Sequence, residues 1–142
     1  MAGFFGKMFG SQRSGGTEIY LVDDSEVFQE LLLQQLNLMI DARISCFTFP
    51  AKLLEYSQQA QRLPDLVISD INMPEMNGFQ LKRSAHKLWQ VRVPFIFVTG
   101  LEEDEDESKD DDLLIISKPV NLDQLKAGLI RYLPPAQHHY LT

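Results

Sequence analysis

The sequence predicts a doubly wound α/β domain, built on a five-stranded parallel sheet with helices on both faces, and two observations support this. Short apolar runs alternate five times with segments whose apolar residues recur at helical spacing. The runs are continuously apolar, which is typical of strands covered on both faces. Since a helical segment follows each strand, we expect parallel strands joined by right-handed crossovers.

The first two strand–helix units follow in order along the chain. An apolar run at 19–22 predicts the first strand, and Ser25 is a suitable N-cap for a helix that continues through Leu36. Residues 42–49 are rich in β-branched and aromatic side chains and predict the second strand. Pro50 then suits the first turn of a second helix, where a missing N–H removes no hydrogen bond.

Three further apolar runs predict the remaining strands: 65–69, 94–98 and 113–116. Asn77 and Gly78 precede the helix after the third strand, which reaches Trp89. Asn121 caps a last helix, and the two prolines at 134–135 end it. Each predicted element therefore has a local signal for its start or its end.

The chain of 142 residues has the length of one domain, and 44% apolar residues are enough for a core. We expect a flexible Gly- and Phe-rich leader (1–16), a domain (17–133) and a short tail (134–142). The single cysteine, Cys46, lies in an apolar run, so we expect a buried thiol and no disulfide framework. No apolar run reaches the ~18 residues of a membrane span, and no secretory signal is present, so we expect a cytoplasmic protein without stable membrane insertion.

The negative charge of the chain is concentrated in one segment. The sequence has 13 Lys and Arg against 20 Asp and Glu, and nine of these acids lie between Glu102 and Asp112. An acidic chain without clustered basic residues is not expected to bind nucleic acid. The acidic segment contains no apolar residue, so we expect the fourth helix to be short or disordered and the segment to be solvated. It could also meet a basic protein partner.

Polar residues end four of the predicted strands. Asp23 and Asp24 follow the first strand, Asp70 the third, Thr99 the fourth and Lys118 the fifth. Because the carboxyl ends of parallel strands meet at one edge, we expect these side chains to share a pocket. Three neighbouring carboxylates favour a hard divalent cation, Mg²⁺ before Zn²⁺. An opposed lysine and threonine suit a phosphoryl group, and a carboxylate there can act as nucleophile.

These motifs resemble the receiver domains of two-component response regulators. The matching segments are Leu-Val-Asp-Asp-Ser at 21–25, Asp-Ile-Asn-Met-Pro-Glu-Met-Asn-Gly at 70–78, Val-Thr-Gly at 98–100 and Ser-Lys-Pro at 117–119. They cover roughly residues 17–133 in the family's order and spacing. The resemblance implies a flavodoxin-like sheet with the strand order 2-1-3-4-5. Since no output domain follows residue 133, we expect a stand-alone receiver similar to the chemotaxis regulators.

The resemblance also implies how the acidic residues act. Asp70 would be the phosphoacceptor, receiving its phosphoryl group from a histidine kinase or a phosphotransfer protein. Asp23, Asp24 and Asp70 would bind Mg²⁺, together with the main-chain carbonyl of Asn72. The protein would then be a phosphoacceptor signalling domain and not an enzyme, although phosphorylation from small donors and self-dephosphorylation are possible. Its output would be a protein–protein interaction.

Four further positions follow from the same resemblance. Thr99 would contact the phosphoryl group and move with it, Lys118 would pair with it, and the bond from Lys118 to Pro119 would be cis. Ile115 stands where the family has an aromatic switch residue, and an isoleucine has no ring to swing. Coupling from Thr99 to the outer face would therefore differ from that of the family.

Alternative functions follow from particular residues. A receiver-like adaptor that acts without phosphorylation is favoured by Ile115. A phosphatase of the haloacid-dehalogenase type would need a second aspartate two residues after Asp70, where this chain has Asn72. A nucleotide-binding flavodoxin-like protein would need a Gly-rich phosphate loop after the first strand, which the sequence lacks.

Overall fold

The computed structural model describes residues 8–9, 16–100 and 112–133. Their strands form one sheet in the order β1-β3-β2-β4-β5-β6. The strands are β1 (Met8–Phe9), β2 (Thr17–Val22), β3 (Ala42–Phe47), β4 (Leu66–Ser69), β5 (Phe95–Thr99) and β6 (Leu113–Ser117). Strands β2 to β6 pair in parallel. Counted without β1, they have the predicted order 2-1-3-4-5, so the predicted fold is confirmed.

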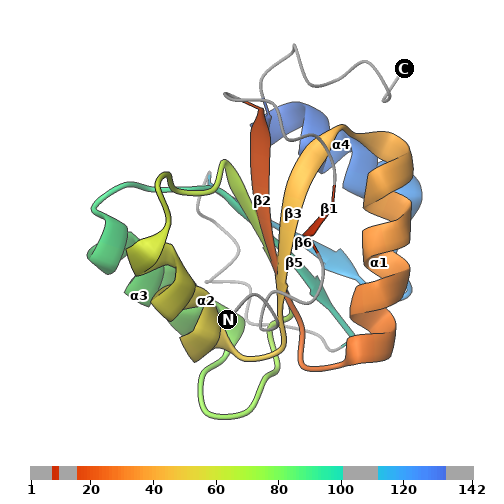
Figure 1. Cartoon of the computed structure of the whole chain (residues 1–142). Helices are drawn as coiled ribbons and strands as arrows, with labels where there is room; N and C mark the ends of the chain where they lie inside the picture. The colour runs from red at the N-terminus through yellow and green to blue at the C-terminus, as the bar shows by residue number, and fades with distance from the viewer. Residues whose placement is uncertain (1–7, 10–15, 101–111, 134–142) are drawn as a thin grey trace.

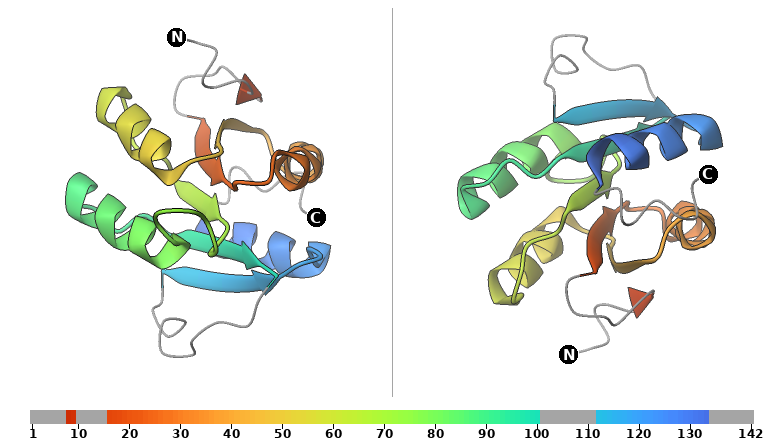
Figure 2. Two further views of the ribbon diagram at one scale, coloured as in Figure 1. Left: turned by 90° about the horizontal axis from the view of Figure 1, so that it is seen from below. Right: turned by 90° about the horizontal axis from the view of Figure 1, so that it is seen from above.

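Helices cover both faces of the sheet, as Figures 1 and 2 show. The described helices are α1 (Glu26–Met39), α2 (Pro50–Gln59), α3 (Gly78–Trp89) and α4 (Leu122–Tyr132). Helices α1 and α4 lie on one face, and α2 and α3 lie on the other. Each face encloses its own apolar core, because the strand side chains alternate between the two sides. Most of the apolar residues predicted to form the strands are accordingly buried, and among the exceptions Leu114 and Ile115 lie on the edge strand β6.

Local capping residues begin three of these helices where the sequence predicted them. The Ser25 hydroxyl accepts a hydrogen bond from the backbone N–H of Phe28 at 3.2 Å. Asn77 forms a reciprocal capping box with Gln80, in which both hydrogen bonds measure 2.8 Å. Asn121 accepts from the third residue of α4 in the same way. These caps satisfy backbone donors that the first helical turn leaves unpaired, and they fix where each helix leaves the sheet edge.

The short strand β1 is a feature that the sequence did not predict. Met8 and Phe9 pair antiparallel with Ser45 and Ile44 of β3, which would otherwise be an edge strand of the sheet. An edge strand has unpaired N–H and C=O groups, so an extended apolar segment can add to it. Apart from Gly16, the rest of the predicted leader lies outside the described residues. The same holds for the predicted tail 134–142, most of the acidic segment and the predicted fourth helix.

The one described member of the acidic segment, Asp112, is not a solvated side chain, contrary to the prediction. Its side chain is 16% exposed, and its Oδ1 lies 3.0 Å from Nζ of Lys82, a buried lysine of α3. Its Oδ2 lies 3.0 Å from Nε of Arg92. Burial alone would raise the pKa of Asp112, but the hydrogen bonds from Arg92 and Lys82 outweigh burial and lower it. These two ion pairs fix Asp112 directly before β6.

Aromatic side chains hold α2 and α3 against the sheet. The Tyr20 ring on β2 contacts the Trp89 ring edge to face, with centroids 6.2 Å apart. The Trp89 Nε1–H donates to the Ser57 hydroxyl on α2 at 2.8 Å. Cys46 of β3 is buried in the opposite core and forms no disulfide bond, as predicted. Among the described residues, no helix is both long and apolar enough to cross a membrane.

Gly78, the first residue of α3, lies where a side chain does not fit. An added Cβ would be 2.5 Å from the Asp70 carbonyl oxygen and 2.8 Å from the Phe97 ring. We expect Gly78→Ala to lower the free energy of unfolding by about 1–3 kcal/mol, because the helix and the loop after β4 must separate to admit the methyl group. Chemical denaturation followed by circular dichroism measures this change.

Gly100 is the matched control for Gly78. A Cβ at Gly100 would meet no atom of the described part of the chain within 4 Å, so Gly100→Ala should leave the stability nearly unchanged. Equal stability of the two variants would contradict the close approach of α3 to Asp70.

Candidate functional site

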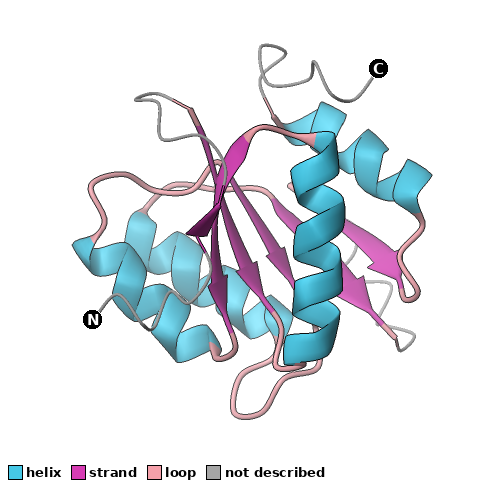
Figure 3. Cartoon of the chain, turned by 45° about the vertical axis from the view of Figure 1, so that its right-hand side comes forward, coloured by secondary structure: helices cyan, strands magenta, loops and turns pink. Residues whose placement is uncertain are grey.

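Three carboxylates meet at the carboxyl edge of the sheet, the edge to which the arrowheads of the parallel strands point in Figure 3. Asp23 follows β2 and Asp70 follows β4, and these two strands are neighbours. Asp23, Asp24 and Asp70 each offer a carboxylate oxygen within 4.8 Å of the others. Asp23 and Asp70 are buried, whereas Asp24 is exposed. The predicted convergence of these three residues is therefore observed, and the cluster opens to solvent on one side.

Backbone hydrogen bonds position the two buried aspartates. The Asp23 N–H donates to the Phe47 carbonyl at 3.1 Å, and the Asp70 N–H donates to the Val22 carbonyl at 3.0 Å. Both residues therefore continue the sheet by one more hydrogen bond. Their side chains each accept a short bond from the loop that follows: Ser25 N–H to Asp23 Oδ1 at 2.8 Å, and Ile71 N–H to Asp70 Oδ1 at 2.7 Å. The carboxylates are fixed before any ligand binds.

Burial makes both carboxylates harder to ionise. Desolvation raises the pKa of Asp23, against the lowering effects of the Ser25 N–H and of Lys118. Desolvation and the negative charge of Asp23 together raise the pKa of Asp70, and the Lys118 ammonium opposes this only in part. Asp70 and Asp23 thus form a site with excess negative charge, which a further cation would relieve.

Lys118 supplies the positive charge of the site. Its Nζ lies 3.2 Å from Asp23 Oδ2 and 3.6 Å from Asp70 Oδ2, and its side chain is 23% exposed. The Lys118 backbone N–H donates to the Thr99 carbonyl at 2.7 Å, which ties the loop after β6 to the end of β5. The peptide bond between Lys118 and Pro119 is cis, in agreement with the family resemblance.

The other predicted residues lie around this cluster in different settings. Thr99 is buried at the end of β5, beside Ser117 of β6. Asn72 is exposed in the loop two residues after Asp70. Ile115 is half-buried on β6 opposite Phe97 and packs against the core under α2 and α3. The metal role of the Asn72 carbonyl and the switching roles of Thr99 and Ile115 remain predictions.

Sequence reasoning missed one residue of the site. Phe28 lies in the first turn of α1, and the centroid of its ring is 4.0 Å from Nζ of Lys118. A signal for it exists in the sequence, because Phe28 is an apolar residue one helical turn after Asp24. Helical spacing alone assigns such a residue to the core, and Phe28 does pack against the core under α1.

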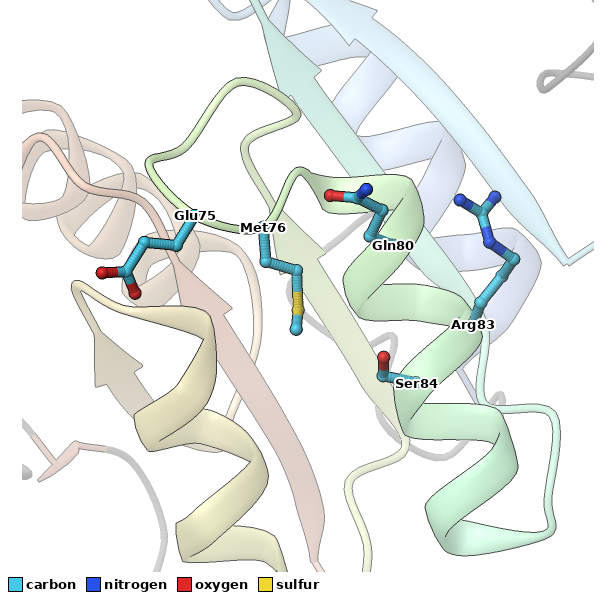
Figure 4. Close-up of a pocket in the computed structure, with 5 residues that line it drawn as sticks. All are labelled: Glu75, Met76, Gln80, Arg83 and Ser84. Atoms are coloured by element: carbon cyan, nitrogen blue, oxygen red, sulfur yellow. The ribbon is translucent and has the colours of Figure 1, made fainter.

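A separate hollow of about 350 Å³ lies between the loop after β4 and helix α3. It is lined by Glu75, Met76, Gln80, Arg83 and Ser84. In Figure 4 the side chains of Gln80, Arg83 and Ser84 project from α3, and Glu75 lies on the loop. None of the clustered aspartates lines this hollow, so it is distinct from the acidic site.

The family model of the response regulator receiver domain matches residues 19–130. With the fold and the acidic cluster described above, this shows that the chain belongs to the receiver domain family of two-component signalling. The fold class and the family predicted from the sequence are therefore confirmed.

Individual relatives agree with this assignment. The sensor histidine kinase RcsC of Salmonella typhi is 31% identical over 117 residues, which cover 80% of this chain and 12% of that protein. The response regulator protein TmoT of Ectopseudomonas mendocina is 33% identical over 82 residues, which cover 58% of this chain and 36% of that protein. The chain thus spans a minor part of the length of these curated relatives.

Solved structures show the same fold. The chemotaxis protein CheY4 of Vibrio cholerae superposes with a TM-score of 0.69 and 25% identity, over 84% of this chain and 100% of that chain. A signal receiver domain of an HD domain-containing protein from Pseudomonas fluorescens Pf-5 has a TM-score of 0.70 and 26% identity, over 87% of this chain and 90% of that one.

Proposed function

We propose that this receiver domain accepts a phosphoryl group on Asp70 in a Mg²⁺-dependent reaction, and that it signals through a protein partner. The observation that carries the proposal is the placement of the Lys118 ammonium 3.2 Å and 3.6 Å from the buried carboxylates of Asp23 and Asp70. A receiver of this kind takes its phosphoryl group from a histidine kinase or a phosphotransfer protein. Its output surface would include the acidic segment between Glu102 and Asp112.

The donor atoms of the site fit a hard divalent cation. Asp23, Asp24 and Asp70 offer only carboxylate oxygens, the ligand type that Mg²⁺ prefers. The cluster sets three carboxylates against the single ammonium of Lys118, so it holds more negative charge than Lys118 balances. Bound there with the Asn72 carbonyl as a further ligand, Mg²⁺ would neutralise this charge and that of the incoming phosphoryl oxygens.

The protein's own residues would carry out the transfer. A carboxylate oxygen of Asp70 forms the new bond to phosphorus while the bond between phosphorus and the donor breaks. Lys118 pairs with a phosphoryl oxygen in place of one of its present carboxylate contacts, and the Thr99 hydroxyl donates to another oxygen. The hydrogen bond from Ile71 holds the Asp70 carboxylate in a fixed orientation during the attack.

Phosphorylation of Asp70 is tested with a small phosphodonor. We expect the wild-type protein, incubated with Mg²⁺ and acetyl phosphate, to gain one acid-stable, base-labile phosphoryl group by intact-protein mass spectrometry. Asp70→Asn should gain none, because an amide is a poor nucleophile. Removal of Mg²⁺ with a chelator should abolish the gain in the wild type.

Asp65 offers the matched control. It precedes β4 at the opposite end of the strand that Asp70 follows, and its Oδ2 accepts a hydrogen bond from the Glu18 N–H that an asparagine can also accept. Asp65→Asn should therefore be phosphorylated like the wild type. Phosphorylation of Asp70→Asn to the wild-type level would refute the assignment of Asp70.

The alternative function is a receiver-like adaptor, which binds its partner regardless of phosphorylation. The specific observation in its favour is Ile115, a residue without a ring at the position of the family's aromatic switch. Nuclear magnetic resonance spectra with and without beryllium fluoride, a mimic of the phosphoryl group, separate the two functions. A switch predicts shifts beyond the pocket at Gly100 and Ile115, whereas an adaptor predicts shifts confined to the residues around Asp70.

A further inference from the structure

The Lys118 ammonium lies among three groups. Two are the carboxylates of Asp23 and Asp70, and the third is the Phe28 ring, whose centroid is 4.0 Å from Nζ. Phe28 is half-buried in the first turn of α1, and the face of its ring is turned to the Lys118 ammonium. The ring thus covers a side of the ammonium that neither carboxylate occupies.

A helix-cap hydrogen bond and core packing hold the Phe28 ring in place. The Phe28 backbone N–H donates to the Ser25 hydroxyl that caps α1, and the side chain packs against the core under α1. A lysine on a surface loop ordinarily samples many rotamers, and fixing one of them carries a loss of side-chain entropy. A cation over an aromatic face is attracted by the ring quadrupole, which favours the one rotamer that also reaches Asp70.

We propose that Phe28 is a positioning residue for phosphoryl binding, because its ring holds the Lys118 ammonium over the site before the phosphoryl group arrives. The inference rests on the proposed phosphoryl acceptance by Asp70 and adds a residue that acts through Lys118. Since Lys118 is already ordered, binding of the phosphoryl oxygens requires no further ordering of its side chain. Phe28 does not touch the reacting atoms, and its effect should be strongest on the affinity for the phosphoryl mimic.

Two variants separate the effect of the aromatic face from the effect of the apolar volume of the side chain. Phe28→Leu keeps an apolar side chain that packs against the core but removes the aromatic face. Phe28→Tyr keeps the face, and its hydroxyl can extend toward solvent. If the ring is what matters, the tyrosine variant should behave like the wild type and the leucine variant should not.

The first measurement needs neither metal nor phosphodonor. Protons that lie over an aromatic face are shielded, so the ε-methylene protons of Lys118 should resonate upfield in the wild type and in Phe28→Tyr. In Phe28→Leu they should return toward the usual position of lysine. An unchanged Lys118 resonance in Phe28→Leu would refute the contact, whatever the function of Asp70.

The second measurement is the affinity for beryllium fluoride at saturating Mg²⁺. We expect Phe28→Leu to bind it about threefold to tenfold more weakly than the wild type, the range expected for one cation–π contact. The affinity of Phe28→Leu for Mg²⁺ alone should not fall, because a less ordered lysine repels the cation less. A site distorted by the substitution would instead bind both Mg²⁺ and beryllium fluoride more weakly.

The outcomes distinguish this inference from the proposed function. Unchanged beryllium fluoride affinity in Phe28→Leu, or an equal loss in Phe28→Tyr, would refute the positioning role while phosphoryl acceptance stands. Failure of the wild type to bind beryllium fluoride would refute phosphoryl acceptance, and the role of Phe28 in it as well.

Discussion

The Asp70→Asn variant is expected to be more stable than the wild type at pH 7 when divalent cations are absent, by about 1–3 kcal/mol. Asp70 is 7% exposed and shares its pocket with the buried carboxylate of Asp23, so ionised Asp70 is held in the folded state at a free-energy cost. An asparagine keeps the acceptor for the Ile71 N–H and removes the charge. Urea denaturation followed by circular dichroism measures the difference.

The pH dependence of this difference has a defined sign. Burial and the charge of Asp23 raise the pKa of Asp70 in the folded state above its unfolded value. The stability associated with such a group is fully present below the unfolded pKa and is lost as the pH rises through the folded pKa. The advantage of Asp70→Asn should therefore be largest near neutral pH and should shrink as the pH falls toward about 4, the ordinary range of an aspartate.

The exposed neighbour, Asp24, provides the control for the stability of Asp70→Asn. Asp24→Asn should change the stability little without a metal, because its side chain is exposed. With Mg²⁺, the wild type should gain stability by ligand binding to the folded state, and both variants should gain less. A loss of stability in Asp70→Asn at neutral pH would contradict the described electrostatics of the site.

Replacing Lys118 by methionine is expected to lower the stability of the fold, in contrast to Asp70→Asn. The substitution keeps the length of the side chain but leaves Asp23 and Asp70 without their shared cation. We expect a loss of about 2–3 kcal/mol at pH 7, below the 3–5 kcal/mol typical of a fully buried pair because Lys118 is partly exposed. The variant should also fail to retain a phosphoryl group.

The loss in Lys118→Met should depend on pH and on metal in a specific way. Without the ammonium, the pKa values of Asp23 and Asp70 rise further, so protonation at low pH should remove most of the deficit. Mg²⁺ should restore part of it at neutral pH. Lys87→Met, an equal charge change at an exposed position of α3, should alter the stability by less than about 0.5 kcal/mol. Equal losses in the two lysine variants would contradict the ion pairs described for Lys118.

Local signals explain why most of the fold could be predicted from the sequence. Ser25, Asn77 and Asn121 act as caps through their own side chains and nearby backbone, so a helix start can be recognised without knowledge of the tertiary structure. The acidic cluster was predictable for a topological reason. Once the strands are parallel, their carboxyl ends meet, and Asp23 and Asp70 must lie at one edge.

The contacts that the sequence did not predict are set by packing between distant segments. Asp112 belongs to a run of acids, and nothing local distinguishes it from its neighbours, yet Lys82 of α3 pairs with it 30 positions away in the sequence. Phe28 and Lys118 are farther apart still and meet because the start of α1 and the loop after β6 both lie at the carboxyl edge of the sheet. Pairing of Met8 and Phe9 with β3 likewise depends on a vacant strand edge.

Trp89 is the sole tryptophan of the chain, and its position determines what its fluorescence can report. Its ring contacts Tyr20 and its indole N–H is bonded to Ser57, at the opposite end of α3 from Gly78. Tryptophan emission therefore reports the packing of α2 and α3 on the sheet, without direct quenching by a ligand at Asp70. A change in emission on phosphorylation would show that a rearrangement at the acidic edge reaches the far end of α3.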